Sequence, residues 1–144
     1  MRTTIMTGGL AIAVMLSSAA YAAHNNAGAK FNIALDGEQV TFGGDPDGSG
    51  TAMVRVTPGT GQLCYTLSAQ MIEPATAAHI HEGPAGGNGP VVVEFTPPTS
   101  GISSGCVDVG RDLASDIVKM PSDYYVVVHN AEYPAGALRG QISR

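Results

Sequence analysis

The chain has 144 residues, of which 44% are apolar and only 13% are charged, and it is rich in glycine (19) and proline (9). This length fits one domain, and this composition favours short strands joined by turns over a helical bundle, a disordered chain or a collagen. Twelve acidic residues outnumber seven basic ones, and the resulting net charge of −5 argues against nucleic acid as a partner.

Residues 1–22 have the pattern of a secretory signal peptide. A positive charge at Arg2 precedes an apolar run, and Ala20-Tyr21-Ala22 has the small residues of a cleavage site. The run is too short for a comfortable membrane-spanning helix, although an uncleaved anchor stays open as the alternative. We therefore expect a secreted or periplasmic protein with no membrane span after cleavage. Residues 23–30 are interpreted as a flexible leader, and residues 31–144 as the domain.

Apolar and polar residues alternate with a period of two along most of the chain from Phe31 onward. Glycine- and proline-rich turns separate the alternating segments, as is typical of strands. The segments are residues 31–35, 52–57, 63–68, 77–82, 91–95, 106–109, 124–129 and 137–142. This spacing predicts an all-β fold, an antiparallel Greek-key sandwich or barrel.

Residues 112–120 depart from this period. They place Leu113, Ile117 and Met120 on one helical face, and Pro121 would end a helix. We expect one or two helical turns packed over an open end of the barrel.

The chain has two cysteines, Cys64 and Cys106, and both follow the signal sequence. An even number of cysteines in an exported chain favours a disulfide. Two buried free thiols are the alternative.

Three of the four histidines fall on predicted strands. His79 and His81 are two residues apart on one strand, so their side chains share a face, and His129 ends a later strand. If the two strands are neighbours, three imidazoles converge, and zinc and copper both accept three nitrogen ligands with an open position. Histidines that only brace the backbone are the alternative. His24 would lie in the leader, which favours no role in the site.

Three other segments give weaker evidence of a functional site. Residues 83–90 are rich in glycine, but they lack the lysine and hydroxyl of a phosphate loop and are better interpreted as a hairpin connection. Residues 45–50 resemble the start of a calcium loop, but Val56 stands where the bidentate glutamate is needed, so we expect a surface turn. Ser103 and Ser104 lie in what we interpret as a flexible stretch with no nucleophile elbow, and no catalytic residue is assigned.

Two motifs resemble those of the CHRD domain family, named after chordin. The first is AAHIHEG at residues 77–83, followed by Gly86 and GPVVV at 89–93. The second is YYVVVH at residues 124–129, followed by PAGALRGQI at 134–142. The resemblance spans about residues 31–142 and implies an exported domain with a similar cysteine pair. It leaves the biochemical role undefined.

The two histidine-bearing strands also resemble those of copper–zinc superoxide dismutase, a Greek-key barrel. That resemblance implies copper ligands at His79, His81 and His129. The chain lacks the additional histidine cluster of a zinc site and the bridging histidine after His81. Arg139 lies near the place of that family's anion-guiding arginine, and we expect it to have a structural or electrostatic role.

The sequence therefore predicts an exported CHRD-like protein that binds copper or zinc through His79, His81 and His129. The alternative, from another class, is a metal-free extracellular structural, adhesive or protein-interaction module. Dismutase-like redox activity is not favoured, because an acidic chain does not favour the steering of an anionic substrate. The metal, the substrate and any protein partner are left open.

Overall fold

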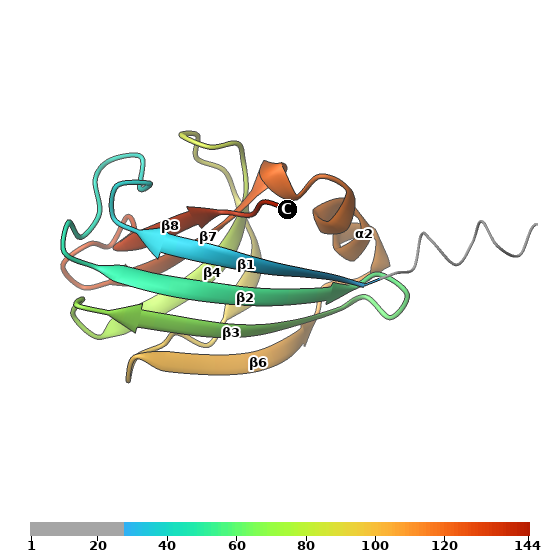
Figure 1. The fold of residues 1–144 in the computed structure, drawn as a ribbon, viewed down its shortest axis with the longest axis horizontal. Helices are drawn as coiled ribbons and strands as arrows, with labels where there is room; N and C mark the ends of the chain where they lie inside the picture. The colour runs from blue at the N-terminus through green and yellow to red at the C-terminus, as the bar shows by residue number, and fades with distance from the viewer. Residues whose placement is uncertain (1–27) are drawn as a thin grey trace, which may run out of the picture.

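A computed structural model describes residues 28–144, which form eight strands, one α-helix and one 3-10 turn (Figure 1). In chain order the elements are β1 (Ala29–Asp36), β2 (Ser49–Thr57), β3 (Gln62–Gln70), β4 (Ala75–Glu82), β5 (Val91–Phe95), β6 (Ile102–Asp108), α2 (Arg111–Lys119), η1 (Pro121–Asp123), β7 (Tyr124–Asn130) and β8 (Leu138–Gln141). The strand positions follow the period-two segments of the sequence.

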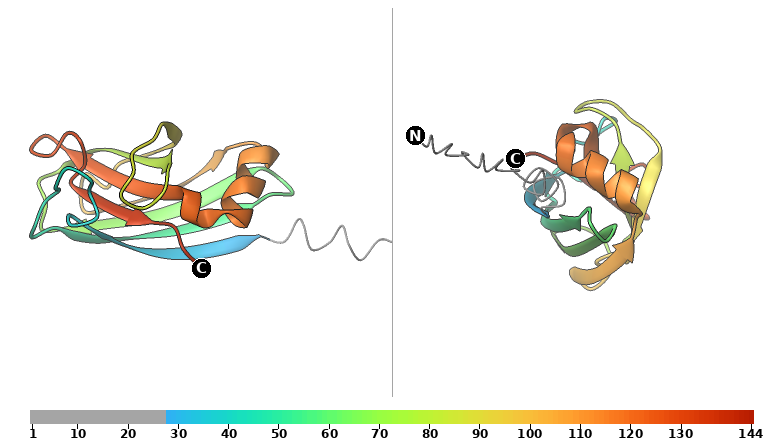
Figure 2. Two further views of the ribbon diagram at one scale, coloured as in Figure 1. Left: turned by 90° about the horizontal axis from the view of Figure 1, so that it is seen from above. Right: turned by 90° about the vertical axis from the view of Figure 1, so that its right-hand side faces the viewer.

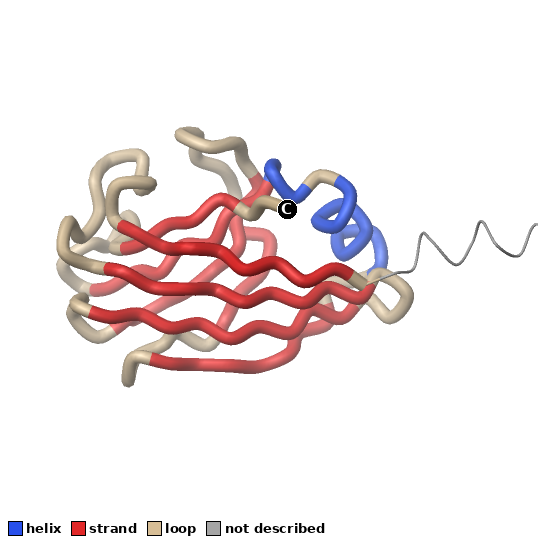
Figure 3. Tube along the Cα trace, viewed as in Figure 1, coloured by secondary structure: helices blue, strands red, loops and turns tan. Residues whose placement is uncertain are grey.

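All eight strands belong to one sheet, in the order β5-β4-β7-β8-β1-β2-β3-β6, and every neighbouring pair is antiparallel. The pairs β4–β7, β1–β8 and β3–β6 join strands that are distant in the sequence, as in a Greek key. The sheet curls so that β1, β2, β3 and β6 lie in front of β4 and β7 (Figure 3). The prediction of an antiparallel barrel-like fold with one helix is confirmed.

Tyr65 spans the gap between the two edge strands, β5 and β6. Its ring stacks on Phe95 with centroids 4.1 Å apart, and its hydroxyl accepts a hydrogen bond of 2.9 Å from the backbone N–H of Thr96. The hydroxyl of Ser103 on β6 donates to the carbonyl of Thr96 at 2.7 Å. A Cβ at Gly105 would approach the Tyr65 hydroxyl to 2.9 Å, so this glycine makes room for the ring. Side chains thus bridge a barrel that the backbone leaves open.

Alternation along β1, β2 and β3 sends one face of each strand into the core and leaves the other in solvent or half-buried. Strand β7 is different, because six of its seven residues are buried and only His129 is partly exposed. Its inward residues Tyr124, Val126 and Val128 belong to the core, so its outward residues must be covered by something else. The groups that cover them form the site described below.

Helix α2 covers one end of the barrel, as predicted (Figure 2). Ala114 and Ile117 are fully buried, and Leu113 packs against the core. The prediction that Met120 shares this face is wrong, because the helix ends at Lys119 and Met120 is 47% exposed. Pro121 follows directly, and a residue that precedes proline is disfavoured in helical conformation.

Strand β6 begins at Ile102, four residues before the predicted start, so the interpretation of Ser103 and Ser104 as a flexible stretch is wrong. Both serines pair with β3, Ser103 with Leu67 and Ser104 with Thr66. No side chain of β6 is fully buried, so the strand carries no strong apolar alternation. Pairing with β3, rather than an apolar pattern, holds this strand in the sheet.

The N-terminal predictions concern mostly residues outside the described part of the chain. The predicted signal peptide, residues 1–22, and His24 lie there. Strand β1 begins at Ala29, so the last two residues of the predicted leader belong to the sheet. Within residues 28–144, no helix has the length and apolar character needed to cross a membrane.

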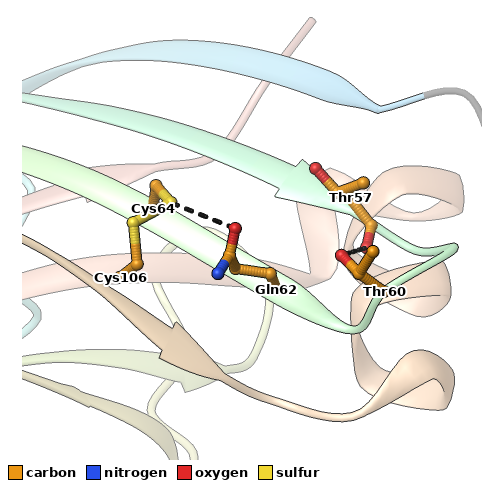
Figure 4. The surroundings of a disulfide bond; sticks show 5 residues. All are labelled: Thr57, Thr60, Gln62, Cys64 and Cys106. Atoms are coloured by element: carbon orange, nitrogen blue, oxygen red, sulfur yellow. Dashed lines mark hydrogen bonds between the residues drawn. A yellow bond between two sulfur atoms is a disulfide. The ribbon is translucent and has the colours of Figure 1, made fainter.

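A disulfide joins Cys64 on β3 to Cys106 on β6 (Figure 4). The two residues are direct partners in the register of the strands, with Cα atoms 4.0 Å apart. Cys64 is partly exposed and Cys106 is exposed. The bond therefore fastens an edge strand to the sheet from its outer surface.

Candidate metal centre

The three predicted ligands come together on the outer surface of β4 and β7. In the antiparallel register, Ala77 faces His129, His79 faces Val127 and His81 faces Tyr125. Ile80 between the two β4 histidines is fully buried, so His79 and His81 must both point outward. Neighbouring strands and a shared face bring His129 beside them.

The imidazoles are close enough to share one ion. One ring nitrogen from each of His79, His81 and His129 lies within 4.8 Å of the others. Their ring centroids are 5.1 Å (His79–His129), 5.6 Å (His79–His81) and 6.2 Å (His81–His129) apart. All three side chains are half-buried, so the cluster is shielded but not closed to solvent.

Backbone carbonyls fix which nitrogen carries the proton in two of the three rings, His81 and His129. Nδ1 of His81 lies 2.9 Å from the carbonyl of Gly89, and Nδ1 of His129 lies 3.0 Å from the carbonyl of Pro134. A carbonyl only accepts, so each Nδ1 donates and each neutral ring keeps a bare lone pair on Nε2. Nε2 of His129 then accepts a hydrogen bond from Nδ1 of His79, at 3.2 Å.

Nε2 of His81 is the exception, because it is buried and has no hydrogen-bond partner among the described residues. Leaving a buried acceptor unpaired costs about 1–3 kcal/mol, and native structures rarely do so without a reason. An unpaired lone pair beside two other imidazoles is therefore available as a ligand for a metal ion.

The surroundings favour the neutral form of two of the three rings. Burial lowers the pKa of His79 below its ordinary value of 6.5, and positive charge on His129 or His81 would lower it further. Burial also lowers the pKa of His129, against the opposing effect of its hydrogen bond to Pro134. Metal binding requires neutral imidazole, so the folded protein keeps both rings ready for an ion near neutral pH.

Tyr125 and Arg139 cover the outer face of β7 beside the cluster. The ring of Tyr125 stacks on His81, with centroids 5.1 Å apart and planes 12° from parallel. The guanidinium of Arg139 lies 3.6 Å from the centroid of the Tyr125 ring, in cation–π contact. Strands β4 and β8 flank β7, so His81 and Arg139 reach this ring from opposite neighbours.

A cavity of about 200 Å³ adjoins the cluster. His81, Tyr125, Val127 and Arg139 form part of its wall, and the ring of Phe42, which is 79% exposed, forms part of its rim. A small external ligand would therefore have room next to His81.

The three ligands could be identified in the sequence by residue type and spacing, but the groups that orient them could not. The carbonyls of Gly89 and Pro134 orient two rings, and backbone atoms leave no mark in residue identity. Residues 83–90 do connect β4 to β5 as a hairpin, as expected. The 45–50 segment contains a tight turn, in which the side chain of Asp45 accepts a hydrogen bond from the N–H of Asp47.

Comparison with protein families identifies the chain. The sequence pattern of the CHRD domain matches residues 31–142, which include both β4 and β7 and all three clustered histidines. Comparisons with the curated proteins and with the solved structures find no match. Because the match covers most of the sequence, the chain belongs to the CHRD domain family.

Proposed function

We propose that this CHRD domain binds a transition metal, copper or zinc, through His79, His81 and His129. The observation that carries the proposal is the buried Nε2 of His81, which has no partner in residues 28–144 and lies beside two other imidazoles. Three nitrogen ligands suit either metal and leave a coordination position open. The adjoining cavity would give an external ligand access to that position.

The metal-free alternative is a structural or protein-interaction module whose histidines only brace the fold. The hydrogen bond between His79 and His129 fits that alternative, because it satisfies two ring nitrogens without an ion. It does not account for His81, whose Nε2 would then stay buried and unpaired at a cost in stability. The metal proposal accounts for all three rings.

We also propose that the protein is exported. Residues 1–22 supply the signal-peptide pattern, and a disulfide within the domain suits an oxidising compartment. Copper and zinc would then be taken up outside the cytoplasm.

Metal titration tests the proposal. The full chain, exported and then freed of metal, is titrated with copper(II) and with zinc(II) in a calorimeter at about pH 7.5. We expect one ion per chain, and an affinity that collapses below about pH 6 because protonated imidazole does not bind metal. His81→Ala should remove most of the affinity.

His24→Ala is the matched control, since His24 is the one histidine outside the cluster, and it should change the affinity little. Equal binding by the wild type and by the variant with alanine at positions 79, 81 and 129 would refute the metal site. The metal-free module would then take its place.

A further inference from the structure

Arg139 on β8 is buried, with 2% of its surface exposed, and it is held by an unusually complete set of hydrogen bonds. Nη1 donates to Oγ1 of Thr41 at 2.9 Å and to the carbonyl of Gly87 at 2.7 Å. Nη2 donates to the carbonyl of Pro84 at 2.9 Å and to Oε1 of Gln141 at 3.2 Å. Each of the four N–H groups on the two terminal nitrogens therefore has its own acceptor.

This arrangement makes Arg139 unsuitable as a receptor for an incoming anion. None of the four acceptors is a carboxylate, so the positive charge is balanced by dipoles and by the Tyr125 ring. Burying a charge in this way is costly unless every hydrogen bond is made. An interaction set this complete points to a positioning role, in which the planar fork of arginine holds several segments at fixed places.

The segment that Arg139 holds most directly is the loop of residues 83–90. Four of its eight residues are glycine, so the loop has little stiffness of its own. Arg139 fixes two of its carbonyls, Pro84 and Gly87. Further hydrogen bonds also anchor the loop: Gln141 Nε2 on the same strand donates to the carbonyl of Gly83, the N–H of Gly89 to the Tyr125 hydroxyl, and Thr41 Oγ1 to Asn88 Oδ1. In the main chain, the N–H of Gly83 donates to the carbonyl of Asp123, and the N–H of Glu82 donates to the carbonyl of Pro90.

The same loop orients His81. The carbonyl of Gly89 accepts the Nδ1 proton of His81, which leaves Nε2 bare on the side of the cluster. Arg139 also reaches His81 by a second route, because the Tyr125 ring that stacks on His81 is in contact with the guanidinium. Both routes begin at one side chain on β8.

We propose that Arg139 is a positioning residue of the metal centre, which holds the 83–90 loop so that Gly89 keeps the Nδ1 proton on His81 and Nε2 faces His79 and His129. The effect on affinity rests on the proposed metal binding. The effect on the His81 ring does not, because the hydrogen bond to Gly89 exists in the metal-free protein.

Two substitutions of Arg139 distinguish the role of its hydrogen bonds from the role of its positive charge. Arg139→Lys keeps the charge but cannot hold four acceptors, and Arg139→Met removes the charge without leaving a buried ion unpaired. Arg55→Met on the exposed face of β2 is the control. Long-range nitrogen–proton NMR of the metal-free protein reports which ring nitrogen of each histidine is protonated.

In the wild type and in Arg55→Met we expect the His81 proton on Nδ1 alone. In both Arg139 variants we expect a mixture of the two His81 tautomers, while His129, whose carbonyl partner Pro134 lies outside the loop, stays unchanged. A His81 proton that remains on Nδ1 in a folded Arg139 variant would overturn the proposal. If neither variant folds, Tyr125→Phe, which removes the acceptor of the Gly89 N–H, tests the step on which the proposal depends, that anchoring of the loop sets the His81 tautomer. A mixture of tautomers is expected there too, and a His81 proton that stays on Nδ1 would overturn the proposal.

Zinc titration supplies the second readout. Loss of a residue that orients a metal ligand typically lowers affinity about 10- to 100-fold, and we expect a loss of this size in both Arg139 variants and none in Arg55→Met. Undiminished zinc affinity in folded Arg139 variants contradicts the positioning role. A wild type that binds neither zinc nor copper refutes the proposed function instead, and the ring-nitrogen spectra then decide the role of Arg139 by themselves.

Discussion

Removing the disulfide should destabilise the domain by a large fraction of its total stability. Cys64 and Cys106 are 42 residues apart in the sequence, and a loop of that length is worth about 4 kcal/mol in the chain-entropy model. Domains of this size are stable by only about 5–15 kcal/mol. Strand β6 offers little compensation, because it lies at the edge of the sheet and has no fully buried side chain. We therefore expect β6 to be the first strand to detach in Cys64→Ala/Cys106→Ala.

Urea unfolding of the double variant measures this effect. A loss of about 4 kcal/mol lowers the midpoint by about 2 M for a typical dependence of about 2 kcal/mol per M. Reductant should lower the wild-type midpoint to the same value and leave the double variant unchanged. Amide exchange should be fastest in β6, while β4 and β7 keep their protection. Equal midpoints for the two proteins without reductant would refute the reasoning.

Two further predictions concern the site. Because the pKa of His79 and that of His129 lie below 6.5 in the folded state, the unfolded chain binds more protons as the pH falls through about 6.5. The metal-free protein should therefore lose stability below about pH 6.5, which urea midpoints measure. His129→Gln should make the midpoint depend less on pH. A wild-type midpoint that is constant from pH 7.5 to about 5 would contradict this prediction. A Cβ at residue 89 would overlap the carbonyl of Glu82. Gly89→Ala should therefore lower the free energy of unfolding by about 1–3 kcal/mol and weaken metal binding. The control is Ala85→Ser at an exposed position of the same loop, which should change neither.

Most of the fold could be predicted from the sequence because most strands have one buried and one exposed face. Strand β3 shows this clearly, since Leu63, Tyr65 and Leu67 are buried in strict alternation. The first four residues of β6, 102–105, escaped prediction because serines and a glycine give no apolar alternation. Met120 was misplaced because helical periodicity does not show that the residue before a proline leaves the helix.

The three ligands of the candidate site could be predicted from the sequence, but the groups that orient them could not. The spacing of His79 and His81 placed them on one face. The position of His129 at the end of a later strand suggested it as their partner, and the resemblance to the dismutase barrel implied the same. Strand periodicity alone does not determine that β4 and β7 are neighbours. The burial of Arg139 was equally hidden, because it depends on two loops folding over β8.

The histidine rings are oriented by main-chain atoms of two turns, at Gly89 and Pro134, and this limits how the site can be moved. Grafting three histidines onto the strands of another barrel would reproduce the spacing of the imidazoles but not the choice of nitrogen that each presents. A designer would have to transplant the 83–90 loop and the turn before β8 together with the arginine that secures the first of them. In this domain the smallest unit that could be transplanted with its ring orientations is therefore the pair of loops on the sheet together with the three histidines.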